Sequence, residues 1–285
     1  MKLVRYKKNN RSYPGVVSDE GKIYDLSSHM NDISDYNLSS TKLLELSKIN
    51  VNNLPLISKY DKLLPCVGNV GKIICVGLNY LDHIKETNAI IPKEPVIFSK
   101  LCLPTGAYDN IIIPKGSYHT DWEVELAVVI GSQCKHVRQE EAFNYIAGYC
   151  IINDLSERKF QLEHEGQWVK GKSCESFAPL GPWLVTQDEI PDIQNLNLYA
   201  KIDSRLYQNS NTNQMLFKVD YLVSYLSKFM ILYPGDVIST GTPPGVGLGF
   251  KPSPIYLKPG QHVEIGIEGL GKQECKTIEY QDTNE

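Results

Sequence analysis

The segment TDWEVELAVVIG, residues 120–131, constrains the fold more than any other part of the sequence. Its pattern predicts a β-strand, and successive side chains of a strand point to opposite faces. One predicted face begins with two acids and continues with apolar residues, whereas the other is apolar throughout. The first face holds Glu123, Glu125, Ala127 and Val129, and the second holds Val124, Leu126, Val128 and Ile130. Only the start of the acidic face can therefore be wet without exposing hydrophobic surface.

The two acids, Glu123 and Glu125, leave two interpretations open. The first is a solvated end of the strand. The second is a cation site, because burial and like-charge repulsion both oppose ionisation of adjacent carboxylates and a bound cation relieves both. Asp154, directly after the apolar run YCIIN, offers a third carboxylate at a strand end. Oxygen ligands of this kind suit Mg²⁺ or Mn²⁺.

The composition excludes several classes of partner. The chain has 285 residues, 42% of them hydrophobic and 22% charged, and a formal net charge of -4. At about 150 residues per domain, this length suggests one large domain or one large and one small domain. Nucleic-acid-binding proteins usually carry a basic excess, which this chain lacks. We therefore expect no nucleic-acid partner.

The cysteines and the apolar runs bear on location. Seven cysteines are scattered along the chain without a Cys-x-x-Cys pair, so neither a zinc motif nor a disulfide framework is indicated. No stretch has the apolar length of a signal peptide or the roughly 18 apolar residues of a membrane span. We expect a reduced, cytoplasmic protein with no membrane partner.

Two parts are predicted along the chain. Residues 1–65 form a small N-terminal α+β domain, with short strand-like runs separated by Gly, Pro and Asp and a helix near residues 41–49. Residues 66–285 form the main domain and are richer in strand-like runs. These runs include GKIICVGLNY, PVIFSK, NIIIP, WEVELAVVIG, GYCIIND, PWLVT, LNLYAKI, DVIST and QHVEIGIEG.

Two helices are predicted in the main domain. EEAFNYIAGY, residues 140–149, stops near Gly148, which suits a helix C-cap. VDYLVSYLSKFMILYPGD, residues 219–236, has an apolar stripe at helical spacing and ends before Pro234 and Gly235. Many strands with few helices predict an α+β fold rather than a regular βαβ array.

Five segments carry a family resemblance over residues 70–275. They are GLNYLDHIKE, DWEVELAVVIG, GYCIINDLSERKFQ, GQWVKGKSCESFAPLGPWL and PGDVISTGTPPGVGLG. In this order they resemble the motifs of the fumarylacetoacetate hydrolase family. The resemblance implies the mixed β-roll of that family's catalytic domain, preceded by a variable N-terminal domain, and a homodimer.

The resemblance also implies a set of site residues. Glu123, Glu125 and Asp154 would hold one Mg²⁺ or Mn²⁺ ion, with Asp121 outside the ligand set. His83, Glu86 and Lys172 would be catalytic, and Gln161, Thr242 and Arg158 would bind substrate. From the residues alone, an exposed helical pair is the favoured interpretation of His83 and Glu86, and Lys170 rivals Lys172.

The implied activity is hydrolysis of a carbon-carbon bond in a 2,4-diketo acid of the acylpyruvate type, a small molecule. The same metal site would also serve a ureidoglycolate lyase, an oxaloacetate decarboxylase or a 2-hydroxyhepta-2,4-diene-1,7-dioate isomerase, since motifs do not fix the substrate. A non-catalytic metabolite-binding protein is an alternative of another class. The glycine-rich loop STGTPPGVGLG fits neither nucleotide fingerprint and is expected to contact a substrate carboxylate.

Overall fold

The computed structural model describes residues 1–87 and 89–282. The strands are β1 (Lys2–Lys8), β2 (Arg11–Val17), β3 (Ile23–Asp25), β4 (Lys62–Leu63), β5 (Ile73–Gly77), β6 (Val96–Lys100), β7 (Ile111–Ile113), β8 (Thr120–Asp121), β9 (Val124–Ile130), β10 (Ile146–Asn153), β11 (Ser156–Glu157), β12 (Leu180–Thr186), β13 (Asn197–Ile202), β14 (Arg205–Asn211), β15 (Val237–Ser239), β16 (His262–Ile267) and β17 (Gly271–Glu279). The α-helices are α1 (Ser40–Leu46), α2 (Leu81–Thr87), α3 (Arg158–Leu162), α4 (Val169–Lys172) and α5 (Val219–Phe229).

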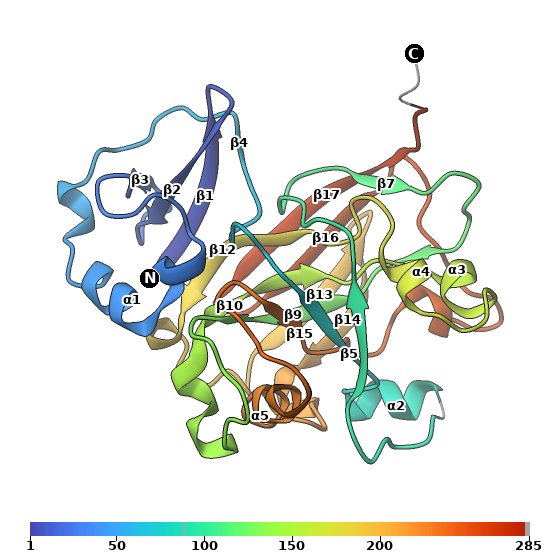
Figure 1. Cartoon of the computed structure of the whole chain (residues 1–285). Coiled ribbons are helices and arrows are strands. Elements are labelled where there is room, and N and C mark those ends of the chain that lie inside the picture. Colours follow the sequence, from blue (N-terminus) through green and yellow to red (C-terminus); the bar gives the residue numbers. More distant parts are fainter. Residues whose placement is uncertain (88, 283–285) are drawn as a thin grey trace.

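Two sheets organise the molecule (Figure 1). The larger sheet has the order β3-β2-β1-β12-β10-β9-β15-β5-β6, with β4 added beside β1. The smaller one has the order β14-β13-β16-β17-β7, and β8 and β11 form a short separate ladder. Most strand pairs in these two sheets are antiparallel, but β15 pairs with β5, and β17 with β7, in parallel. The fold is α+β, as the sequence predicts.

Strand β9 lies inside the large sheet and is buried along its whole length. The predicted alternation of faces is confirmed from Val124 to Ile130, but the strand predicted over residues 120–131 is interrupted, because Trp122 and Glu123 lie between β8 and β9. Val124, Leu126, Val128 and Ile130 belong to the core cluster that includes residues of β13, β16 and α5. Ala127 and Val129 belong to a second cluster, which includes Leu43 and Leu46 of α1. Both faces of β9 are thus packed, and Glu125 within it and Glu123 directly before it are both buried.

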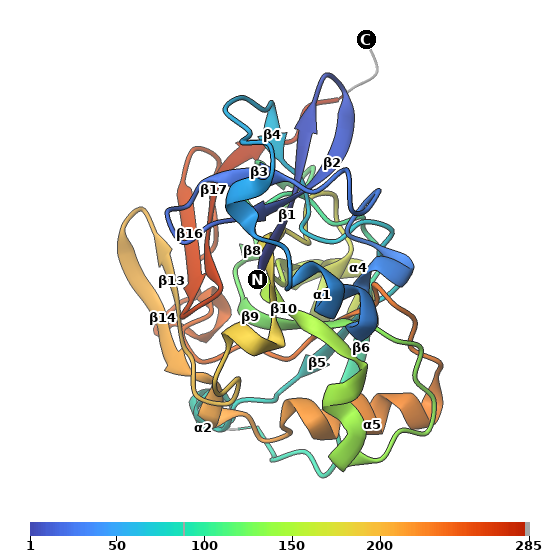
Figure 2. The ribbon, with the colours of Figure 1, turned by 90° about the vertical axis from the view of Figure 1, so that its left-hand side faces the viewer.

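The N-terminal residues join the same sheet as the rest of the chain. Strand β1 pairs with β2 on one side and with β12 on the other. Figure 2 views the molecule from the side of these strands, with α1 close to the N-terminus. The hydrogen-bonded sheet therefore runs without interruption from this unit into the main part. The division at residue 65 stays a prediction.

The helix predicted over residues 140–149 is wrong. Gln139–Tyr145 forms a 3-10 helix, and the remaining residues begin β10. Gly148 is not a helix cap. It lies in β10, where a Cβ atom would come within 2.2 Å of the carbonyl oxygen of Val185 in β12. The glycine is needed because two paired backbones approach closely, and pairing across the sheet overrides the local helical pattern.

The second predicted helix is confirmed as α5, although it ends at Phe229 and not at Pro234. Its buried stripe packs into the larger core cluster; the residues are Val219, Leu222, Val223 and Leu226. Within the described ranges, no helix has both the length and the apolar character needed to cross a membrane.

Candidate active site

Three carboxylates meet where β9 and β10 lie side by side. Oxygen atoms of Glu123, Glu125 and Asp154 all lie within 4.8 Å of one another, and the three residues are buried. The antiparallel register pairs Ile152 with Glu125, and the backbone N–H of Asp154 donates to the carbonyl oxygen of Glu123 at 3.0 Å. The pairing of two strands thus brings together acids that lie about thirty positions apart in the chain.

Lys172 connects two of these acids. Its Nζ donates to Glu123 Oε2 at 2.6 Å and to Asp154 Oδ2 at 2.8 Å. Burial favours the neutral amine, but Asp154 and Glu123 outweigh burial and raise the pKa of Lys172. Lys170, its rival in the sequence, donates instead to the carbonyl oxygen of His164.

The position of Lys172 depends on a close helix contact. Lys172 ends α4, which packs against α3. A Cβ atom on Gly171 would lie 2.4 Å from the carbonyl oxygen of Glu157 and 2.5 Å from the backbone nitrogen of Gln161. Glycine at this position therefore allows α4 to approach α3 closely enough for Lys172 to reach the acids.

A second buried lysine, Lys100, was missed in the sequence. It ends β6, and its Nζ donates to Asp154 Oδ1 at 2.5 Å and to the carbonyl oxygen of Leu155 at 3.0 Å. Its side chain is fully buried. A charged residue that closes an apolar strand was the signal that singled out Asp154, and the same signal is present in PVIFSK. That the partner of Lys100 is Asp154, directly after β10, is not visible in the sequence.

Arg158 holds the outer side of the acidic cluster. Its guanidinium donates from Nε to Asp121 Oδ2 at 2.8 Å, from Nη2 to Glu123 Oε1 at 2.7 Å and from Nη1 to Gln161 Oε1 at 3.0 Å. Asp121 also accepts from the backbone N–H groups of Gly247 and Leu248. Asp121 therefore holds Arg158 and a loop, and it lies outside the cluster of three acids.

The two glutamates experience opposite electrostatic environments. Burial alone would raise the pKa of Glu123, but Lys172 and Arg158 lower it to about 2. Burial, together with Asp154 and Glu123, raises the pKa of Glu125 well above its usual value. Among the described residues, the donors to Glu125 are both neutral: Ser239 Oγ at 2.5 Å and the backbone N–H of Gly241 at 2.8 Å. The charge of Glu125 is thus not balanced by a direct ion pair.

The charge count suits a divalent cation. The buried centre contains four acids and three bases: Asp121, Glu123, Glu125 and Asp154 against Lys100, Lys172 and Arg158. One carboxylate remains in excess, and the three clustered acids supply the hard oxygen atoms that Mg²⁺ and Mn²⁺ bind. The residues present therefore fit such an ion.

The predicted pair on α2 is assembled. His83 Nδ1 lies 3.0 Å from Glu86 Oε2, and the other oxygen of Glu86 accepts from the backbone N–H of Gly245 at 3.0 Å. The His83 side chain is 12% exposed and that of Glu86 is 28% exposed. The pair is therefore anchored to the glycine-rich loop and still in contact with solvent.

A cavity of about 400 Å³ lies beside the acidic cluster, and Glu123 is the member of the cluster that lines it. Its polar lining includes His83, Glu86, Glu123, Arg158, Gln161, Lys172 and Thr242. Its apolar lining includes Phe98, Leu162, Trp168, Val246 and Leu248. The rings of Phe98 and Trp168 meet edge to face with centroids 5.3 Å apart, and Phe98 lies below the Lys172 ammonium. The cavity thus combines a charged floor with an apolar wall.

Thr242 enters this cavity with its hydroxyl already engaged. Its Oγ1 donates to the carbonyl oxygen of Val124 at 3.1 Å and accepts from Gln208 Nε2 at 2.8 Å. The sequence suggests that this hydroxyl donates to a substrate. Since the hydroxyl proton is donated to the carbonyl oxygen of Val124, the hydroxyl holds the loop against β9 in this structure.

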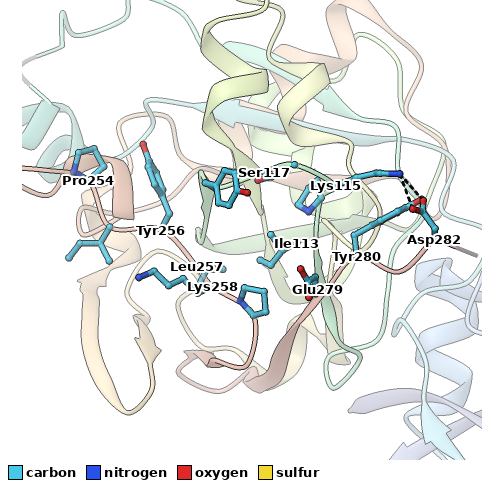
Figure 3. Close-up of a pocket in the computed structure, with 15 residues that line it drawn as sticks. Ile113, Lys115, Ser117, Pro254, Tyr256, Leu257, Lys258, Glu279, Tyr280 and Asp282 are labelled. Atoms are coloured by element: carbon cyan, nitrogen blue, oxygen red, sulfur yellow. Dashed lines mark hydrogen bonds and ion pairs between the residues drawn. The ribbon is translucent and has the colours of Figure 1, made fainter.

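A larger cavity of about 610 Å³ lies elsewhere (Figure 3). None of the predicted site residues lines it. Lys115 and Asp282 form an ion pair at one end, and Ser117 and Tyr256 lie farther along. Size alone therefore does not locate the chemistry, because the group of carboxylates and bases lies beside the smaller cavity.

Comparisons with known proteins agree with this geometry. Residues 72–278 match the family described as fumarylacetoacetate (FAA) hydrolase C-terminal. A Burkholderia lata protein, whose name assigns it provisionally as a hydrolase, is 53% identical over 277 residues, which are 96% of this chain and 97% of that protein. A chain with these motifs, this fold and this match belongs to the fumarylacetoacetate hydrolase family.

Two solved structures are similar over almost the whole chain. Fumarylacetoacetate hydrolase from Exiguobacterium antarcticum has a TM-score of 0.85 and 32% identity, covering 98% of this chain and 100% of that one. Maleylpyruvate hydrolase from Sphingobium sp. SYK-6, solved with manganese(II) and pyruvate, has a TM-score of 0.80 and 25% identity, covering 99% and 100%.

Proposed function

We propose that the protein is a divalent-metal-dependent hydrolase that cleaves a carbon-carbon bond in a 2,4-diketo acid of the acylpyruvate type and releases pyruvate or a related 2-oxo acid. The observation that carries this proposal is a cluster of three buried carboxylates beside a cavity that is lined by Glu123 of the cluster, by the buried Lys172 and by the pair of His83 and Glu86. The manganese and pyruvate in the similar maleylpyruvate hydrolase support the same assignment.

The metal would be held by Glu123, Glu125 and Asp154, as Mg²⁺ or Mn²⁺ with one ion per chain. A bound ion of this kind supplies Lewis acidity toward the oxygen atoms of a 2-oxo acid. With a divalent cation bound, the net charge of the buried centre would change from one negative to one positive, and this favours an anionic substrate. A 2,4-diketo acid carries such a charge on its carboxylate.

The acid–base step is assigned to the pair on α2. Glu86 accepts from His83 Nδ1 and so orients the ring, which leaves His83 Nε2 to take a proton from a water molecule. The water oxygen bonds to the carbonyl carbon farther from the carboxylate. The bond between that carbon and the next one breaks, and the electron pair stays on the 2-oxo acid fragment as an enolate. Protonation of the enolate carbon gives the second product.

The negative charge that develops on the leaving fragment needs a cation. Lys172 lines the cavity, and its raised pKa keeps it charged at neutral pH. Its ammonium would stabilise the enolate oxygen, and a fixed charge in a water-poor site is effective in this role. Arg158 and Gln161, which are joined by a hydrogen bond, would orient the substrate beside it.

The test is a coupled assay for pyruvate release from acetylpyruvate and longer 2,4-diketo acids. Protein treated with EDTA should be inactive, and adding Mg²⁺ or Mn²⁺ should restore pyruvate release. If metal binds but no diketo acid is cleaved, the hydrolase assignment fails, and ureidoglycolate, oxaloacetate and 2-hydroxyhepta-2,4-diene-1,7-dioate are the next substrates to assay. If none of these reacts, the protein is better described as a metabolite binder.

We also propose a homodimer in the cytoplasm. The support is the family habit and seven cysteines that are all free of disulfides in this structure. Sedimentation equilibrium of the purified protein tests the dimer, and a single species at the monomer mass of 32.1 kDa would contradict it.

A further inference from the structure

Gln208 occupies a place in the site that none of the family motifs indicates. It lies on β14 in the segment QNSNTNQM, and its side chain is fully buried. Its Oε1 accepts from the backbone N–H of Val124 at 3.0 Å. Its Nε2 donates to Thr242 Oγ1 and to the carbonyl oxygen of Pro243, both at 2.8 Å. The amide group of Gln208 therefore accepts one hydrogen bond from the strand that carries Glu125 and donates two to the glycine-rich loop.

The partners of Gln208 explain why these bonds matter. Val124 stands between the clustered acids Glu123 and Glu125, so its backbone sets where both side chains begin. The Thr242 hydroxyl closes a ring of contacts by donating to the carbonyl oxygen of Val124. Gln208 thus bonds to both the segment that carries the two glutamates and the glycine-rich loop, and it reinforces the direct bond between Thr242 and Val124.

We propose that Gln208 is a positioning residue that fixes the Glu123–Glu125 segment against the Thr242 loop and so prearranges the metal ligands. The proposal rests on the metal site of the proposed function. Only a side chain with both a donor and an acceptor completes this set, because buried polar groups that lose a partner are left without solvent. Methionine has a similar length and offers neither an N–H donor nor a strong acceptor.

The experiment compares Gln208→Met with wild type and with a matched control. The control is Asn209→Ala on the same strand. Asn209 is exposed and lies on the opposite face of β14, where it pairs with Tyr199. Mn²⁺ affinity is measured by calorimetry on metal-free protein, together with far-UV circular dichroism, kcat and KM. Loss of an outer contact to a metal site typically weakens binding about 10- to 100-fold.

We expect Gln208→Met to weaken Mn²⁺ binding by about 10- to 100-fold with an unchanged circular dichroism spectrum, and Asn209→Ala to bind as wild type does. Thr242→Val, which removes the hydroxyl between Gln208 and Val124, provides a second variant if Gln208→Met does not fold. The double variant should lose little more affinity than the weaker-binding single variant, since the two residues act as a unit.

The outcomes separate this inference from the function beneath it. Wild-type protein that binds no Mn²⁺ overturns the metal site and, with it, the positioning role. If the wild type binds Mn²⁺ and a folded Gln208→Met or Thr242→Val variant binds it equally well, the positioning role alone is overturned. Fully additive losses in the double variant would also contradict the joint action of the two residues.

Discussion

The acidic centre and helix α2 face the same cavity but are built differently. Asp154 is fully buried, and its two carboxylate oxygens are bound by Lys100 and Lys172. His83 and Glu86 remain partly exposed on a helix of seven residues. Buried charges require partners on every side, whereas an acid–base pair must exchange protons with water. The centre is therefore fixed in place, while α2 is held by the buried side chain of Ile84 and by polar contacts such as that of Glu86 with Gly245.

The largest effect is expected from the centre. Glu125→Ala, or its isosteric counterpart Glu125→Gln, should abolish both Mn²⁺ binding and turnover, because one of three ligands is lost. The fold should persist, since burial beside other acids makes the charge of Glu125 unfavourable. Calorimetry and the pyruvate assay measure this. Exposed Glu163→Ala is the control, and full activity in a Glu125 variant would remove that residue from the ligand set.

The α2 pair should affect turnover without affecting metal binding. His83→Ala is expected to lower kcat by about 10²- to 10⁴-fold, the usual contribution of general acid–base catalysis, with Mn²⁺ affinity unchanged. Glu86→Gln should lower kcat less, because the imidazole itself remains. An unchanged kcat in His83→Ala would refute the assignment, and weakened metal binding would show that the two regions are not independent.

Added metal should stabilise the centre. A free Mn²⁺ concentration about 100 times the dissociation constant adds about 2.7 kcal/mol to the free energy of unfolding, which raises the melting temperature by about 5 °C for a chain of this size. Differential scanning calorimetry with and without EDTA measures the shift. Glu125→Gln should show no shift, and an equal shift in that variant would indicate that the metal binds elsewhere.

The smallest effect concerns the attachment of α2. Ser210, on the same face of β14 as Gln208, donates to Asp82 Oδ2 at 2.5 Å. Ser210→Ala removes this bond, worth about 1 kcal/mol, and should speed amide hydrogen exchange in α2 about fivefold while leaving β9 protected. Mass spectrometry of peptic fragments compares the two segments. Equal exchange in α2 of both proteins would show that this contact does not hold the helix.

The sequence predicted the centre better than its surroundings. Alternation along β9 and the position of Asp154 after an apolar strand pointed to three carboxylates, and these lie together. The same reasoning gave no role to Lys100 or Gln208, whose partners are 54 and 84 residues away along the chain. Pattern reasoning reads neighbours along the chain and along one strand face, so it misses partners that only sheet packing supplies.

Secondary structure shows the same limit. The apolar stripe of α5 packs into the core as the sequence pattern predicts, and the helix is confirmed. Residues 140–149 carry a weaker helical pattern, and the last four of them belong to β10, because that strand completes hydrogen bonds with β9 and β12. Local preference decides the secondary structure of a segment where strand pairing favours neither helix nor strand. Where the two conflict, strand pairing decides it.

The sequence by itself determined the family through its motifs, the α+β character and three candidate acids, and it left open whether the acidic end of the predicted strand is solvated. Tertiary structure alone decided which base neutralises which acid. Glu123 is held by Lys172 and Arg158, Asp154 by Lys100 and Lys172, and Glu125 by neutral donors. The physical reason is that charge balance depends on distance in space, and the bases come from β6, α3 and α4, which only the folded chain brings around β9 and β10.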